Sequence, residues 1–107
     1  MPVSLERQVR EAAERRILFL PHAVRQMNRP ERMIGTDEIR KVVGEGTINE
    51  DYPEDVRGRS CLILGFGEGG RPIHVVCAPK EEYLAIITAY VPDEQQWENN
   101  FTERKRK

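Results

Sequence analysis

One stretch of this 107-residue chain decides its fold: SCLILGFGEGGRPIHVVCA, residues 60–78. Leu, Ile and Val crowd both ends and four glycines lie between them, which is typical of two strands joined by a tight turn. The glycines also satisfy the pattern G-x-G-x-x-G, but a phosphate-binding loop needs a helix to begin at the third glycine. Residues 73–78 instead have the composition of a strand, so we interpret residues 65–70 as a hairpin turn.

More strands and helices lie on both sides of this hairpin. The predicted strands are 47–52, 60–66, 73–78 and 83–91, and the predicted helices are 5–16, 21–27 and a segment that begins with Thr36 as its N-cap. Residues 17–20 fit either a short strand or the end of the first helix. Consecutive strands with short links imply an antiparallel meander with the helices packed on one face, which is an α+β domain.

The last long strand is stopped by Pro92 and Asp93. Residues 94–101 are then predicted as a short helical turn, with Trp97 and Phe101 four residues apart on one face. We therefore divide the chain into an N-terminal helical extension (1–16), one domain (17–101) and a basic tail (102–107).

The charge is distributed unevenly although the net charge is only −1. Residues 17–101 hold 9 basic and 14 acidic side chains, whereas residues 102–107 hold four basic side chains against one glutamate. Because a general nucleic-acid-binding domain is expected to be basic, the acidic body disfavours that class.

The sequence indicates a cytoplasmic protein without a membrane partner. No apolar run approaches the roughly 20 residues that cross a bilayer, and charges throughout residues 1–16 disfavour a secretory signal. Two cysteines are too few for a disulfide framework.

A metal site would need Cys61 and Cys77 to meet His22 and His74. If the glycine turn centres near residue 68, the two cysteines lie nearly opposite each other in the hairpin. The close C-x-x-C or H-x-x-x-H spacing of metal sites is absent, so we expect no metal and no cofactor, and two small buried thiols.

Two histidines carry the chemical hypotheses. Strand alternation places His74 on one face with Val76 and Ala78, where it is either a hydrogen-bonded histidine of the sheet or a general acid or base on an open face. His22 lies in the first turn of a predicted helix, with Arg25 three residues later on the same face. These two residues fit a solvated helix edge. With His74 they also supply the two proton-transfer groups and the cation that RNA cleavage without a metal needs.

Other polar residues add candidate phosphate donors, although each alone also fits a packing or surface role: Tyr52, Arg59, Thr88 and Tyr90. An acidic run, Glu50, Asp51, Glu54 and Asp55, fits a solvated loop or a docking surface for a basic partner. The basic tail, residues 104–107, fits a disordered end or a source of non-specific phosphate affinity.

Several segments together resemble one family of small bacterial and archaeal proteins, the domain of unknown function 4258. They are His22-Ala23, Met27, Ile39, Tyr52-Pro53-Glu54-Asp55, residues 60–65, Pro72-Ile73-His74-Val75-Val76, Ile86-Ile87-Thr88-Ala89-Tyr90, and Pro92-Asp93 followed by Trp97. The resemblance covers residues 17–101. It departs in the first motif, where the family commonly has Arg directly before the Met, because Gln26 holds that position here and Arg25 lies one residue earlier.

This family is similar in fold to the RelE/ParE-like toxins, which pack two helices on a curled antiparallel sheet. That superfamily contains endoribonucleases that work without a metal, on free or ribosome-bound mRNA, and also gyrase poisons that cleave nothing. The resemblance implies a toxin neutralised by a cognate antitoxin, with RNA or the ribosome as its target. It carries over His22, Tyr52, His74, Thr88 and Tyr90 as site residues.

Two functions follow as hypotheses. The first is a toxin-like, metal-independent endoribonuclease in which His22 and His74 exchange protons and Arg25 or Arg59 stabilises the developing charge. The second is a non-catalytic module of the same fold that acts through a protein partner, because an acidic body suits a basic protein better than RNA.

Overall fold

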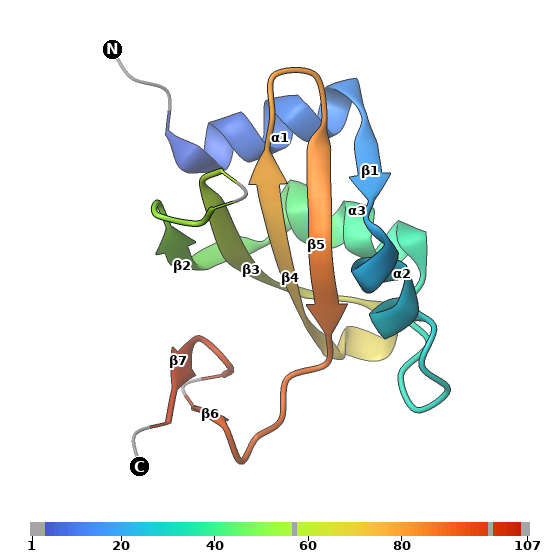
Figure 1. Ribbon diagram of the computed structural model, residues 1–107. Helices are drawn as coiled ribbons and strands as arrows, with labels where there is room; N and C mark the ends of the chain where they lie inside the picture. The colour runs from blue at the N-terminus through green and yellow to red at the C-terminus, as the bar shows by residue number, and fades with distance from the viewer. Residues whose placement is uncertain (1–3, 57, 99, 106–107) are drawn as a thin grey trace.

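A computed structural model describes residues 4–56, 58–98 and 100–105. Within these residues, three α-helices lie on one side of a five-stranded sheet, and a small C-terminal hairpin contacts the sheet from its other side (Figure 1). The helices are α1 (Leu5–Arg15), α2 (Pro21–Met27) and α3 (Thr36–Glu45). The strands are β1 (Ile17–Phe19), β2 (Thr47–Tyr52), β3 (Ser60–Phe66), β4 (Pro72–Pro79), β5 (Leu84–Tyr90), β6 (Trp97–Glu98) and β7 (Glu103–Arg104). The predicted α+β class is confirmed.

The sheet has the strand order β1-β5-β4-β3-β2 and is mixed rather than wholly antiparallel. Strands β2 to β5 form the predicted meander, but β1 pairs with β5 in parallel, from Ile17 opposite Leu84 to Phe19 opposite Ile86. The prediction of a fully antiparallel sheet is therefore wrong at this edge. Residues 17–19 form a strand because the end of α1 delivers the chain beside the start of β5, where the Arg16 carbonyl accepts a hydrogen bond from the Leu84 amide.

The glycine-rich stretch forms the predicted turn of the β3–β4 hairpin. Gly69 and Gly70 have φ angles of 65° and 76°, a region in which glycine alone is unstrained. The turn sets a register in which Cys61 faces Cys77, with their buried sulfur atoms 4.0 Å apart. The expected pair of buried thiols is confirmed.

The core lies between the sheet and the three helices. Alternation along β4 sends Ile73, Val75 and Cys77 toward the helices and the residues between them toward the other face. Helix α1 belongs to this core, since Val9 and Ala12 are fully buried in it. The segment described as an N-terminal extension therefore completes the core.

The C-terminal segment forms a hairpin instead of the predicted helical turn. One hydrogen-bonded turn follows Asp93, but then β6 and β7 pair, with Trp97 opposite Arg104. The helix prediction is wrong because Trp97 and Phe101 both turn back to the sheet, which the backbone achieves with a φ of 68° at Phe101. Within the basic tail, Glu103 and Arg104 form β7 and the Lys105 amide donates to the Gln96 carbonyl, and residues 106–107 lie outside the described part.

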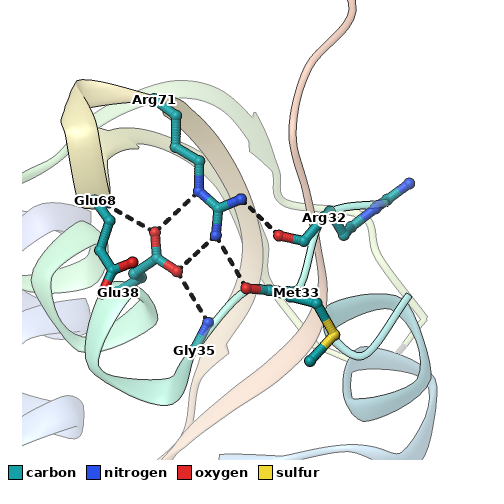
Figure 2. Close-up of polar contacts among 6 residues, drawn as sticks. All are labelled: Arg32, Met33, Gly35, Glu38, Glu68 and Arg71. Atoms are coloured by element: carbon teal, nitrogen blue, oxygen red, sulfur yellow. Dashed lines mark hydrogen bonds and ion pairs between the residues drawn. The ribbon is translucent and has the colours of Figure 1, made fainter. Parts of the chain in front are cut away.

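An ion pair between Glu38 and Arg71 joins α3 to the β3–β4 hairpin (Figure 2). The buried carboxylate accepts from the Arg71 Nη2 at 2.7 Å and Nε at 3.1 Å. It also accepts from the Gly35 amide at 3.0 Å and the Glu68 amide at 2.9 Å. Gly35 is thus the N-cap of α3 and Thr36 its first helical residue, which corrects the predicted cap, because the Glu38 side chain supplies the capping acceptor.

The same guanidinium fixes the loop before α3. Its Nη1 and Nη2 donate to the carbonyl oxygens of Arg32 and Met33 at 2.5 and 3.1 Å (Figure 2). These bonds hold Met33 at a φ of 42°, the left-handed region that costs a non-glycine residue about 1 kcal/mol or more. One side chain thereby connects the loop, the start of α3 and the hairpin turn.

We expect the Arg71→Ala variant to lose roughly 2 kcal/mol of unfolding free energy, because hydrogen bonds to a buried charged group contribute on that scale. Urea unfolding at neutral pH measures it. The Lys41→Ala variant, which removes an exposed cation of α3, serves as the control and should change the free energy little.

The stability of the protein should also depend on pH through Glu38. Hydrogen bonds from Arg71 and the two amides outweigh burial and lower the pKa of this carboxyl from 4.5 to about 2. The unfolded chain therefore binds the proton first, so the contribution is present above pH 4.5 and is lost as the pH falls toward 2. Between these values the wild type should lose more unfolding free energy than the Glu38→Gln variant, and equal losses would contradict this role.

Candidate active site

Four of the seven predicted site residues share the sheet face that points away from the helices. Strand register puts His74 of β4 directly opposite Tyr90 of β5, and Thr88 follows two residues away on the same face. Tyr52 of β2 lies on this face as well, together with Glu50, which is bonded to it. The structure thus brings together side chains from three strands that are far apart in the sequence.

His74 is nevertheless sealed from solvent by the C-terminal hairpin. The Trp97 ring lies against the imidazole edge to face, with their centroids 4.3 Å apart, and the exposed fraction of His74 is 0%. The Phe101 carbonyl accepts from the His74 Nε2 at 2.8 Å and from the Asn49 Nδ2 at 3.1 Å. Of the two alternatives for His74, the structure has the hydrogen-bonded histidine of the sheet and not the open face, because Trp97 and Phe101 cover that face.

The hydrogen bonds of His74 assign its tautomer. A carbonyl oxygen only accepts, so Nε2 carries the proton and Nδ1 is left as an acceptor, 3.3 Å from the Tyr90 hydroxyl, which donates to it. Burial lowers the pKa of His74, more than its bond to Phe101 raises it. The imidazole is therefore neutral and fully bonded at physiological pH.

Beside His74, three polar side chains form a cluster that is partly open to solvent: Glu50, Tyr52 and Arg104. The Arg104 Nε and Nη2 donate to the two Glu50 carboxylate oxygens at 2.9 and 3.1 Å, and its guanidinium lies 4.7 Å from the centre of the Trp97 ring. The Tyr52 hydroxyl donates to the Glu50 Oε1. We name these three residues the Glu50 cluster.

The Glu50 cluster fixes the protonation of its own members. Burial alone would raise the pKa of Glu50, but the hydrogen bonds from Arg104 and Tyr52 outweigh it and the pKa lies below the ordinary value of 4.5. Burial and the bond to Glu50 raise the pKa of Tyr52 to about 12. At neutral pH the cluster therefore consists of a carboxylate, a neutral phenol and a guanidinium.

Two members of the Glu50 cluster were missed in the sequence. The acidic run that contains Glu50 is predicted as a solvated loop or a docking surface for a basic partner, although the i, i+2 spacing of Glu50 and Tyr52 in a predicted strand indicates that both share one face. For Arg104 the sequence predicts either a disordered end or a source of non-specific phosphate affinity, and not a site residue. Nothing local in the sequence indicates that it reaches back to a carboxylate 54 positions earlier.

His22 and Arg25 lie elsewhere. Both are exposed on α2, which packs through Ala23 and Met27 into the core on the helix side of the sheet, whereas His74 points to the opposite side. The expected meeting of the two histidines is therefore wrong. Residue types alone do not show which face of the sheet α2 covers, and that face decides whether the two histidines can meet.

Arg59 also lies outside the Glu50 cluster. Its Nε and Nη2 donate to the two Asp51 carboxylate oxygens at 3.1 and 2.5 Å on an exposed part of β2. Asp51 and Glu50 are adjacent in a strand, so their side chains point to opposite faces.

Over residues 4–56, 58–98 and 100–105, no three His, Cys, Asp or Glu side chains gather in a way that could hold a metal ion. The same residues include no helix long and apolar enough to span a membrane.

Comparison with models of known protein families shows to which family the chain belongs. The family model described as Domain of unknown function (DUF4258) matches residues 19–91, more than half of the sequence. The chain belongs to the DUF4258 family. No curated protein and no solved structure matches it.

The boundaries of the DUF4258 match divide the candidate site. Glu50, Tyr52 and His74 lie within the matched residues, whereas Trp97 and Arg104 come after them. In this DUF4258 protein, strands within the match therefore supply the Glu50 carboxylate and the Tyr52 phenol. The C-terminal hairpin, which follows the match, supplies the Arg104 guanidinium and the Trp97 ring that covers His74.

The fluorescence of Trp97, the only tryptophan of the chain, should report protonation of His74. The folded pKa lies below the ordinary 6.5, so as the pH falls below 6.5 the unfolded or open state binds the proton first and the closed hairpin loses stability. We expect a red shift of the emission between pH 6.5 and 5.

The His74→Gln variant keeps an N–H toward Phe101 and should show no such shift. The His22→Gln variant removes the other, exposed histidine and should behave like the wild type. A shift that persists in His74→Gln would assign it to another group.

Proposed function

We propose that this chain is a metal-independent endoribonuclease of the toxin–antitoxin type, with a RelE/ParE-like fold and the Glu50 cluster as its active site. One observation carries this: a carboxylate, a phenol and a guanidinium converge within hydrogen-bonding distance on one sheet face. They are also reachable, since the side chains of Glu50 and Arg104 are 25% and 61% exposed. A base, a proton donor and a cation are what RNA cleavage needs when no metal takes part.

Glu50 is the general base. It takes the proton of an RNA 2′-hydroxyl, whose oxygen then attacks the adjacent phosphorus. A substrate phosphate that binds Arg104 weakens the two bonds that hold the pKa of Glu50 low. Burial, which raises that pKa, then dominates, so the carboxylate becomes a stronger base when substrate is bound.

Tyr52 is the proton donor. As the bond from phosphorus to the 5′-oxygen breaks, the leaving oxygen takes the phenol proton, which gives a 2′,3′-cyclic phosphate and a 5′-hydroxyl. The Glu50 carboxyl then returns its proton to the phenolate along their direct hydrogen bond. Both groups regain their starting state, and no net proton is consumed.

Arg104 stabilises the charge that develops on the phosphate, and its planar fork suits two phosphate oxygens. His74 is a positioning residue: it holds the Phe101 carbonyl, and through it the hairpin that places Arg104 beside Glu50. A toxin of this kind would be neutralised by an antitoxin protein.

Cleavage of a labelled single-stranded RNA tests this function, with and without ribosomes and with EDTA present throughout. We expect wild-type protein to give cyclic-phosphate ends, and Glu50→Gln to be slower by about 100-fold or more, as for loss of a general base. Arg104→Gln should be slower as well, and Arg104→Lys should recover part of the rate.

Glu54→Gln, which removes an exposed carboxylate of the next loop, is the matched control and should cleave at the wild-type rate. His74→Gln should keep most of the rate, and its pH profile should match that of the wild type. If wild-type protein cleaves no RNA in either assay, the nuclease is wrong and the non-catalytic, protein-binding module remains.

A further inference from the structure

An apolar groove lies on the helix side of the molecule, away from the Glu50 cluster. It runs between α2 and the loop that leads into α3, has a volume of about 380 Å³, and is lined by Phe19, Val24, Met27, Met33 and Ile34 among others. Val24 and Met33 are 41% and 61% exposed. Exposed aliphatic side chains that border a groove are typical of a surface that binds another protein.

The exposure of Met33 is built into the fold. Arg71 holds the loop by the carbonyls of Arg32 and Met33, and the Met33 backbone is kept in its strained left-handed conformation while its side chain stays in solvent (Figure 2). Strain of this kind persists where the surrounding structure enforces it, and it is concentrated at binding sites. The groove is thus preformed rather than a product of loose packing.

The segment that supplies most of the groove lining is basic in an otherwise acidic domain. In the sequence, Arg25, Arg29 and Arg32 each adjoin a residue of the lining, and Asp37 is the one acidic residue that does so. Arg29 already pairs with Glu31, whose Oε1 lies 3.5 Å from the Arg29 Nη1. Residues 36–101, in contrast, hold 6 basic and 13 acidic side chains.

The side chain of Arg32 offers a second, independent sign of a missing acidic partner. Its Nη1 is buried and has no hydrogen-bond partner among the described residues. Leaving a guanidinium N–H unbonded away from water costs free energy, and an incoming carboxylate would remove that cost once the side chain turns toward it.

We propose that this groove binds an acidic amphipathic segment of a protein partner, with aliphatic side chains in the groove and carboxylates on Arg25 and Arg32. RNA fits poorly, because Phe19 is the one aromatic side chain of the lining and is partly buried, which offers bases little to stack on. A second copy of the chain that used the same face would bring two basic segments together. The inference does not depend on whether the Glu50 cluster cleaves RNA.

Selection from a random peptide display library on the full-length protein tests the proposal. We expect the enriched peptides to combine Asp or Glu with Leu, Ile or Phe. Fluorescence anisotropy of a labelled selected peptide should show binding that weakens with added salt, and about tenfold or more on Val24→Glu or Met33→Glu. Arg32→Gln should weaken binding as well.

Val56→Glu adds the same charge at a fully exposed valine outside the groove and should bind like the wild type. Circular dichroism and thermal melting of each variant confirm equal folding, which the exposure of the replaced side chains favours. The proposal is overturned if nothing is enriched, if the enriched peptides are basic, or if Val24→Glu and Val56→Glu bind equally. It is also overturned if a short RNA, or a second copy detected by light scattering, occupies the groove in place of the peptide.

Discussion

The Glu38–Arg71 pair is the interaction on which most of this structure depends. A carboxylate taken out of water must be hydrogen-bonded, and here the donors come from two separate parts of the chain, the N-cap of α3 and the β3–β4 turn. These hydrogen bonds fix the first residue of α3 and the position of the β3–β4 turn. The bonds that Arg71 donates to Arg32 and Met33 fix the loop before α3. The space is so restricted that a Cβ on Gly67 would lie 2.1 Å from the Glu38 Oε2. The buried charge thus fixes the position of the loop that borders the apolar groove.

The two faces of the sheet differ in how they are covered. Three helices bury the face with Val75 and Cys77 in one continuous core. The opposite face, with His74 and Thr88, is covered in part by a hairpin of two very short strands. Such a hairpin has little stability of its own. Its position therefore depends on the side chains that it covers. The placement of Arg104 is thus coupled to the contacts that the hairpin makes with His74.

Local patterns predicted most of the fold but little of the candidate site. The β3–β4 register, with Cys61 opposite Cys77, followed from the glycine turn and strand alternation. The parallel pairing of β1 and the C-terminal hairpin did not, because β1 pairs with the distant β5 and the hairpin packs on the distant His74. The same limit applies to the site. Alternation along one strand can place Tyr52 beside Glu50, but which face α2 covers, and that Arg104 returns to β2, are decided only by tertiary packing.

The parallel pairing of β1 also bears on the order in which the chain folds. Its partner strand β5 lies near the far end of the sequence, so α1, β1 and α2 leave the ribosome long before residues 84–90 exist to receive them. The hairpins from β2 to β5 can form first, from contacts between neighbouring segments, whereas closing the long loop to β1 is entropically the most costly step. The segment from α1 to α2 would then pack last, onto a meander that has already formed.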